Sequence, residues 1–169
     1  MPTYSDWARE RRGFMEFSPG KSLLAAIRLY QRCRHPLLRP VRWLAVIRWR
    51  FWSAVSGAEI PLSTTLGGGL LIPHPNGIVM HPDVIVGANC LIYQQVTLGS
   101  REGSTGVPIL GDHVDVGAGA KCLGPIKIGR GSRVGANAVV VNDVPPGSTA
   151  IGIPARVKGN KRVRVYHAS

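Results

Sequence analysis

A strict six-residue repeat in the second half of the chain limits what this sequence can fold into. An aliphatic residue or cysteine recurs at every sixth position through Leu110, Val116, Cys122, Ile128, Val134 and Val140. Glycine follows four of these six residues, and a small or β-branched residue stands four places after each. A period of six fits neither the 3.6-residue turn of an α-helix nor the two-residue alternation of a long strand. Each unit therefore predicts one short strand and one corner.

The same step extends upstream through the middle of the chain. It passes through Ile60, Leu66, Ile72 and Ile78 and, after a slip of two residues, through Val86, Ile92 and Leu98. The slip and the segment 99–109 are its only breaks. Three units are expected to close one triangular coil, because stacked coils pair their backbones and bury together the aliphatic residues that one coil leaves exposed. The sequence thus predicts an all-β fold, a parallel β-helix over residues 59–158.

Residues 1–58 precede the repeat and are expected to form a helical region. Leu23 and Ile27 lie about one helical turn apart, which predicts a first helix with an apolar face. Pro36 and Pro40 then end this helix, because proline lacks the backbone N–H that a helix interior requires.

The second predicted helix is basic and amphipathic. It carries the apolar residues Trp43, Ile47 and Phe51 on one stripe and the cations Arg42, Arg48 and Arg50 beside them. The sequence leaves two roles open for this helix. One is a cap packed on the β-helix or on another subunit, and the other is attachment to an anionic membrane surface.

The positive charge of the chain is concentrated at its two ends. The net charge is +12, and eleven of the 21 lysines and arginines fall within residues 1–58. Five more lie close to the C-terminus, where residues 159–169 are expected to form a loose basic tail. No helix-turn-helix, RNA-binding aromatic motif or zinc-finger spacing accompanies this charge, so no nucleic-acid partner is expected. The acidic partners that remain are anionic lipid, a phosphorylated carrier and the phosphates of a cofactor.

The cysteines and the N-terminus favour a cytoplasmic protein. Cys33, Cys90 and Cys122 have neither CxxC nor Cys/His spacing, which is typical of reduced thiols and predicts no metal site. Charged residues occupy the N-terminal stretch where a signal peptide has its apolar core, and no run of about 18 apolar residues occurs. The expected location is the cytoplasm, either free or at the inner face of the membrane.

The segment 60–159 resembles the serine acetyltransferase family and its relatives in polysaccharide biosynthesis. The resemblance rests on the phrases LIPHPNGIV, IYQQVTLGS and VPPGSTAIGIPARVKG, which occur in the family's order. It implies a left-handed β-helix, acetyl-CoA as the donor substrate, and a homotrimer with sites between neighbouring subunits. The left hand comes from the resemblance alone, because parallel crossovers are normally right-handed.

The resemblance also implies a catalytic pair. His74 matches the family's catalytic histidine, and Glu59 aligns with the aspartate that orients it. An imidazole with a pKa near ~6.5 suits the removal of a proton from a hydroxyl, and a carboxylate on its other nitrogen fixes the tautomer. Residues matching the family's coenzyme A contacts are Gly99, Ser100, Ala118, Ala136, Arg156 and Lys158.

The acceptor side departs from the serine-specific members. Pro73 replaces an aspartate that contacts serine, and Gly106 and Val107 replace an Arg-His pair. A zwitterionic acceptor needs charged partners for both ends, so a saccharide hydroxyl in polysaccharide biosynthesis is the expected acceptor and L-serine the alternative. The short helical region also resembles exopolysaccharide and colanic-acid acetyltransferases in proportion.

Three further expectations concern partners and alternatives. Docking to cysteine synthase is not expected, because the chain ends in Ser169 rather than the isoleucine that those enzymes use. A catalytically silent β-helix scaffold is the non-enzyme alternative, and failure to bind coenzyme A would favour it. Nucleic-acid binding would require salt-dependent binding that survives removal of both basic ends.

Overall fold

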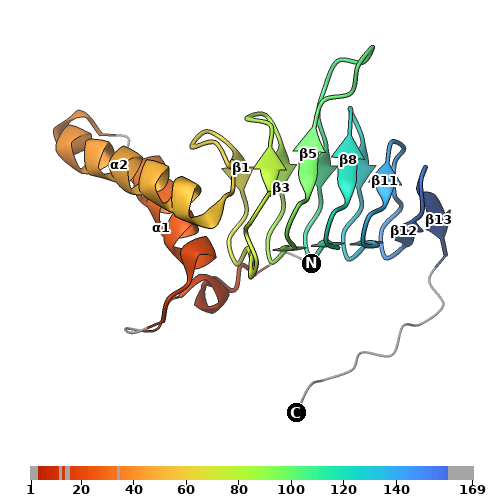
Figure 1. Ribbon diagram of the computed structural model, residues 1–169, viewed down its shortest axis with the longest axis horizontal. Coiled ribbons are helices and arrows are strands. Elements are labelled where there is room, and N and C mark those ends of the chain that lie inside the picture. The colour runs from red at the N-terminus through yellow and green to blue at the C-terminus, as the bar shows by residue number, and fades with distance from the viewer. Residues whose placement is uncertain (1–3, 12, 14–15, 34, 160–169) are drawn as a thin grey trace.

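The computed structural model describes residues 4–11, 13, 16–33 and 35–159, with helices at one end of a stack of short strands (Figure 1). The helices are η1 (Trp7–Glu10), α1 (Pro19–Arg32), η2 (Pro36–Leu38) and α2 (Arg39–Ser56). The strands are β1 (Thr65–Leu66), β2 (Val79–Met80), β3 (Ile85–Val86), β4 (Leu91–Ile92), β5 (Thr97–Gly99), β6 (Ile109–Leu110), β7 (Asp115–Val116), β8 (Lys121–Leu123), β9 (Lys127–Ile128), β10 (Arg133–Val134), β11 (Val139–Val140), β12 (Thr149–Ile151) and β13 (Arg156–Lys158).

The strands form three sheets that the chain visits in rotation. One sheet has the order β1-β3-β6-β9, a second β2-β5-β8-β11, and the third β4-β7-β10-β12-β13. All neighbours are parallel except β12 and β13, which are antiparallel. From β2 to β11 each strand is followed by a strand of the next sheet, as coils of three repeats require. The parallel strands and the short helical region are confirmed, and the left hand stays a prediction.

The repeat residues form the core of this stack, which we call the coil stack (residues 58–158). Every aliphatic or cysteine position of the repeat is buried, while the strand residue before it points outward and is wholly or partly exposed. The coils also approach closely at their corners. A Cβ placed on Gly87 would lie 2.5 Å from the carbonyl carbon of Gly111 in the next coil, so only glycine fits there.

The structure moves the two-residue slip to a different place. The bridge between Leu71 and Leu91 puts Ile72 beside Ile92, and the next strand pairs Met80, rather than Ile78, with Leu98. The repeat therefore steps by eight between Ile72 and Met80, and the slip lies before Ile78 instead of after it. Both Ile78 and Met80 are buried, and apolar periodicity alone did not distinguish the two.

Helix α1 closes the end of the coil stack. Its buried residues Leu23, Leu24 and Ile27 join the same core as Ile60 and Leu70. Helix α2 packs against α1 and ends at Ser56; Gly57 follows in the left-handed conformation, directly before the coil stack begins. The domain limits at residues 58 and 158 stay predictions, and the basic tail after Gly159 lies outside the described residues. No described helix is long and apolar enough to cross a bilayer.

Candidate functional site

His74 lies on an exposed turn whose length comes from the slip. The turn occupies residues 73–78 and is two residues longer than the matching turn before β5. Prolines on both sides of His74 restrict its backbone to extended conformations. The extra length and the two prolines present the imidazole at the surface of a rigid turn.

Both helices touch the polypeptide around this turn. The backbone N–H of Gly77 donates to the carbonyl of Gly57, at the end of α2, over 2.8 Å. At the start of α1, Gly20 packs so closely on the Ile72 carbonyl that a Cβ there would collide with it. The helical region therefore fixes the position of the turn from two sides.

Glu59 lies at the outer edge of the sheet that begins after the His74 turn, where the first coil closes. Its backbone forms a parallel bridge with Val79, with N–H donation from Glu59 to the Ile78 carbonyl over 2.7 Å. The side chain is exposed, between the buried Ala58 and Ile60. The chain thus returns to Glu59 shortly after His74, although the described residues include no hydrogen bond between these two side chains.

Turns of successive coils stack on the turn of His74 and form one corner of the coil stack, which we call the His74 corner. Three backbone hydrogen bonds join its levels, from Gln95 to Asn76, from Gly119 to Gln94 and from Asn137 to Ala118, each 2.8–2.9 Å long. The structure thereby places Ala118 and Ala136 one above the other. With ~4.8 Å between adjacent strands, they lie roughly 10 and 14 Å along the stack from the His74 turn.

The last level of this corner leads to the two predicted cations. The N–H of Ala155 donates to the Val139 carbonyl, and the N–H of Val139 donates to the Gly152 carbonyl. Arg156 and Lys158 follow on β13 and are exposed. Because β13 runs back along β12, Arg156 pairs with Ile151 beside the corner and Lys158 pairs with Thr149 at the far edge of the third sheet. The His74 corner therefore has a histidine at one end, small residues with turn amides between, and the cation Arg156 at the other end, with Lys158 set back from it along the third sheet.

Gly99 and Ser100 lie at a different corner. The His74 turn lies at the edge where the chain enters the strands of the β2-β5-β8-β11 sheet. Gly99 is the last residue of β5 and lies at the opposite edge, where the chain leaves that sheet. The loop 100–108, exposed over residues 100–106, projects from that edge (Figure 1). One chain does not bring this loop to His74.

Two residues that the sequence does not single out also belong to the His74 corner. The buried Oε1 atom of Gln94 has no hydrogen-bond partner in the described part of the chain. The Nζ of Lys121 donates to the Gln95 carbonyl over 2.6 Å and so fastens the turn below. Only the registers of the folded coils bring these residues together, since they come from separate repeats.

The cysteines do not supply a nucleophile. Burial raises the pKa of Cys122 to about 12 and that of Cys90 to about 11, so both remain protonated at neutral pH. All three side chains are buried and free of disulfides. Within the described ranges, no group of three or more His, Cys, Asp or Glu residues is placed to hold a metal ion.

The chain is similar in sequence to serine acetyltransferases. That of Synechococcus elongatus is 48% identical over 113 residues, which cover 66% of this chain and 46% of the relative. That of Staphylococcus aureus is 38% identical over 146 residues, covering 85% and 65%. The chain thus spans about half to two thirds of the length of these curated relatives. No family model matches it.

Solved structures give the same relationship. The Neisseria gonorrhoeae serine acetyltransferase in complex with serine has a TM-score of 0.70 at 37% identity, covering 83% of this chain and 57% of that one. A serine acetyltransferase in complex with CoA has a TM-score of 0.71 at 30% identity, covering 84% and 58%. These similarities support membership of the hexapeptide-repeat acyltransferase family that contains the serine acetyltransferases.

The comparisons correct one expectation. The preference for a saccharide acceptor in polysaccharide biosynthesis is wrong, because the curated relatives at 38–48% identity are serine acetyltransferases and a structural neighbour was solved with serine. The prediction relied on the loss of three charged groups at Pro73, Gly106 and Val107. Charged side chains on other elements can bind the carboxylate and ammonium groups of serine. A comparison limited to the positions that match the family's serine-binding residues does not detect them. A relationship to exopolysaccharide acetyltransferases is not supported.

Proposed function

We propose that the protein is an O-acetyltransferase that moves an acetyl group from acetyl-CoA to the hydroxyl of L-serine. The observation that carries the proposal is the His74 corner, which stacks a surface histidine, the turn amides of successive coils and, at its last level, Arg156. The similarity to serine acetyltransferases supports the choice of acceptor. The left hand of the coils belongs to the same proposal.

His74 is the general base in this proposal. Its imidazole takes the proton of the serine hydroxyl as the oxygen attacks the thioester carbonyl, and the C–S bond then breaks. The departing sulfur takes the proton from the imidazolium, which returns His74 to its neutral form. Glu59 stabilises the imidazolium from the adjacent outer position once bound substrates bring the two side chains together.

The donor lies along the His74 corner. Coenzyme A is elongated, with its thioester and its phosphates at opposite ends. The amides near Ala118 and Ala136 accommodate the arm, because small side chains there leave the backbone accessible. Arg156 lies at the end of the corner where the phosphates arrive, with Lys158 two residues further along β13. Charge-assisted hydrogen bonds to phosphate are among the stronger polar contacts.

A homotrimer completes the site in this proposal. His74 and the Gly99–Ser100 turn lie at opposite edges of one sheet, so a neighbouring subunit must bring its own loop to the His74 corner. That loop carries Arg101 and Glu102, both exposed. They provide a cation for the serine carboxylate and an anion for its ammonium group, in place of the family's missing residues.

The test is thiol release from acetyl-CoA with L-serine and with a panel of sugars. We expect turnover with serine, and Arg101→Gln should raise the KM for serine roughly 10- to 100-fold, the scale of a charge-assisted hydrogen bond. The KM for acetyl-CoA should not change. Turnover with sugars alone, or a monomer by light scattering at micromolar concentration, would contradict the proposal.

A further inference from the structure

Helix α2 exposes a row of large apolar side chains on the face that points away from α1. This α2 stripe consists of Trp43, Leu44, Ile47, Phe51 and Val55, and Trp43, Ile47 and Phe51 are 70%, 62% and 58% exposed. The opposite face of the helix already carries the packed residues Ala45, Trp49 and Trp52. The packing of α2 on the rest of the protein therefore does not use the α2 stripe.

Arginines border the α2 stripe on both sides. At 3.6 residues per turn, Arg39 and Arg50 fall on one edge of the exposed apolar arc and Arg48 falls on the other. A helix with an apolar face between two rows of cations is suited to lie in a membrane interface, with the cations at the level of the lipid phosphates.

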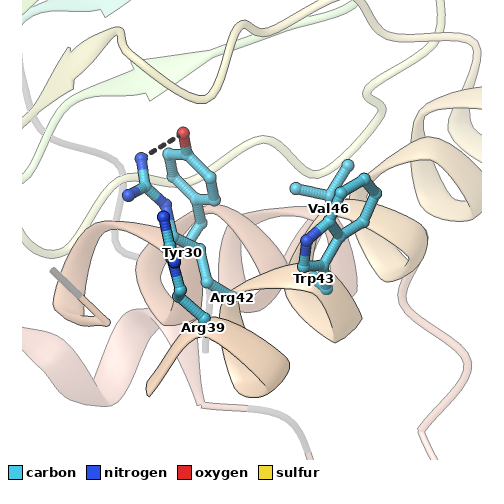
Figure 2. A pocket seen from close by; sticks show the side chains of 5 residues that line it. All are labelled: Tyr30, Arg39, Arg42, Trp43 and Val46. Carbon is cyan, nitrogen blue, oxygen red and sulfur yellow. Dashed lines mark hydrogen bonds between the residues drawn. The ribbon is translucent and has the colours of Figure 1, made fainter. Parts of the chain in front are cut away.

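A basic cavity lies beside each edge. Figure 2 shows the first, of about 280 Å3, where Arg39 and Arg42 lie next to Tyr30, and Trp43 and Val46 complete the lining. Arg42 donates to the Tyr30 hydroxyl over 2.5 Å and stacks on its ring.

The second cavity has about 570 Å3 and lies between η1, α1 and α2. Its lining includes Arg11, Arg32 and Arg48, together with Glu10, whose carboxylate pairs with Arg28. Both cavities are large enough for a phosphate group and present guanidinium groups to it.

The charge around the stripe decides between two occupants. Residues 17–58 contain eight lysines and arginines and no aspartate or glutamate. A second copy of the helix would bring like charges together without an acidic partner, which opposes association. An anionic lipid surface provides the complementary charge, and each arginine near such a surface contributes about fivefold in affinity.

We propose that α2 lies in the headgroup region of a bilayer that contains anionic lipid, with the α2 stripe facing the acyl chains. The C-terminal end of the helix contacts the His74 turn through Gly57. Bound in this way, the protein carries its His74 corner close to the membrane surface. The proposal stands independently of the acetyl acceptor.

The experiment is cosedimentation of the full chain with vesicles of phosphatidylcholine, with and without phosphatidylglycerol. We expect binding at least tenfold tighter with phosphatidylglycerol, and weaker binding at high salt. Ile47→Ser should lower this affinity roughly tenfold. The matched control is Ile153→Ser, since Ile153 is 74% exposed on the distant end of the coil stack and its replacement should have no effect.

A second pair of variants tests the charge. Arg48→Gln should weaken vesicle binding about fivefold, whereas Lys127→Gln, which removes an exposed charge from the coil stack, should leave it unchanged. Equal binding to both kinds of vesicle would overturn the proposal. So would an assembly in lipid-free solution that is larger than a trimer and that Ile47→Ser dissociates, because a second copy would then cover the stripe.

Discussion

The coil stack and helix α2 use the same apolar residue types in opposite ways. In the coil stack, apolar residues recur every six positions and point inward, and the described repeat positions are buried. In α2, one face is packed, but the opposite face carries the exposed side chains of Trp43, Ile47 and Phe51. Apolar side chains therefore form a core only where the fold supplies neighbours on every side, and a contiguous exposed row of them indicates a contact surface.

The largest expected effect comes from separating the helical region from the coil stack. Arg28 on α1 pairs with Glu10 over 2.9 Å and donates to the carbonyls of Leu66 and Gly67 over 2.6 Å. Both charged side chains are only 10–11% exposed. Arg28→Met leaves the carboxylate and both carbonyls without their main partner, so it should lower the free energy of unfolding by about 3–5 kcal/mol.

The matched control for Arg28→Met is Lys21→Met, which breaks the more exposed pair between Lys21 and Glu16. It should cost at most about 1 kcal/mol. Denaturant unfolding of both variants measures the difference. Equal losses would mean that the buried pair does not hold the helical region to the coils.

The second prediction compares one substitution in both regions. Leu98→Ala removes a fully buried side chain from β5 and should lower the free energy of unfolding by about 2–5 kcal/mol. Leu44→Ala removes a side chain that is 53% exposed on α2 and should change it by less than about 0.5 kcal/mol. A comparable loss from Leu44→Ala in chemical denaturation would show that another subunit packs on α2.

The smallest expected effect concerns pH and the coil core. Because burial raises the pKa of Cys122 to about 12, the folded protein keeps this proton at a pH where the unfolded chain, with a thiol pKa near ~8.5, has lost it. The contribution is thus complete below about pH 8.5 and is lost as the pH rises toward 12. From this one thiol, stability should fall by on the order of 2 kcal/mol between about pH 8 and about pH 10.5.

Cys122→Ala separates this effect from other alkaline changes. The variant is less stable at every pH, but its stability should fall less between the two pH values, by about the contribution of one thiol. Unfolding followed by fluorescence at both pH values gives the comparison. The same slope in both proteins would refute the assigned cause.

The two regions also differ in how far the sequence predicts them. The hexapeptide period predicts that the chain visits three sheets in turn and which residues point inward, because the same six-residue spacing applies to nearly every coil. It misplaces the slip, since Ile78 and Met80 are both apolar and only the pairing of Met80 with Leu98 selects between them. For α2, the pattern predicts an amphipathic helix but leaves open which of its faces is covered.

The candidate site is likewise predicted only in part from the sequence. The motif around His74 gives the residue, and the registers of the coils put Ala118, Ala136 and Arg156 on its corner. Gln94 lies within the phrase IYQQVTLGS but has no role assigned there, and Lys121 lies outside the quoted phrases, so only the folded corner identifies them. The acceptor could not be predicted from the replaced residues, because an absent side chain does not indicate which group on another element takes its role.

The most direct test of the account is the turnover of His74→Ala with acetyl-CoA and L-serine. If His74 removes the acceptor proton, kcat should fall by roughly 10² to 10⁴, while the affinity for coenzyme A stays nearly unchanged because backbone amides and distant cations hold the donor. Glu59→Gln should cost less, and almost nothing in the His74→Ala background, since the two side chains act as a unit. Turnover of His74→Ala equal to that of the unaltered protein would contradict the mechanism and leave only the fold.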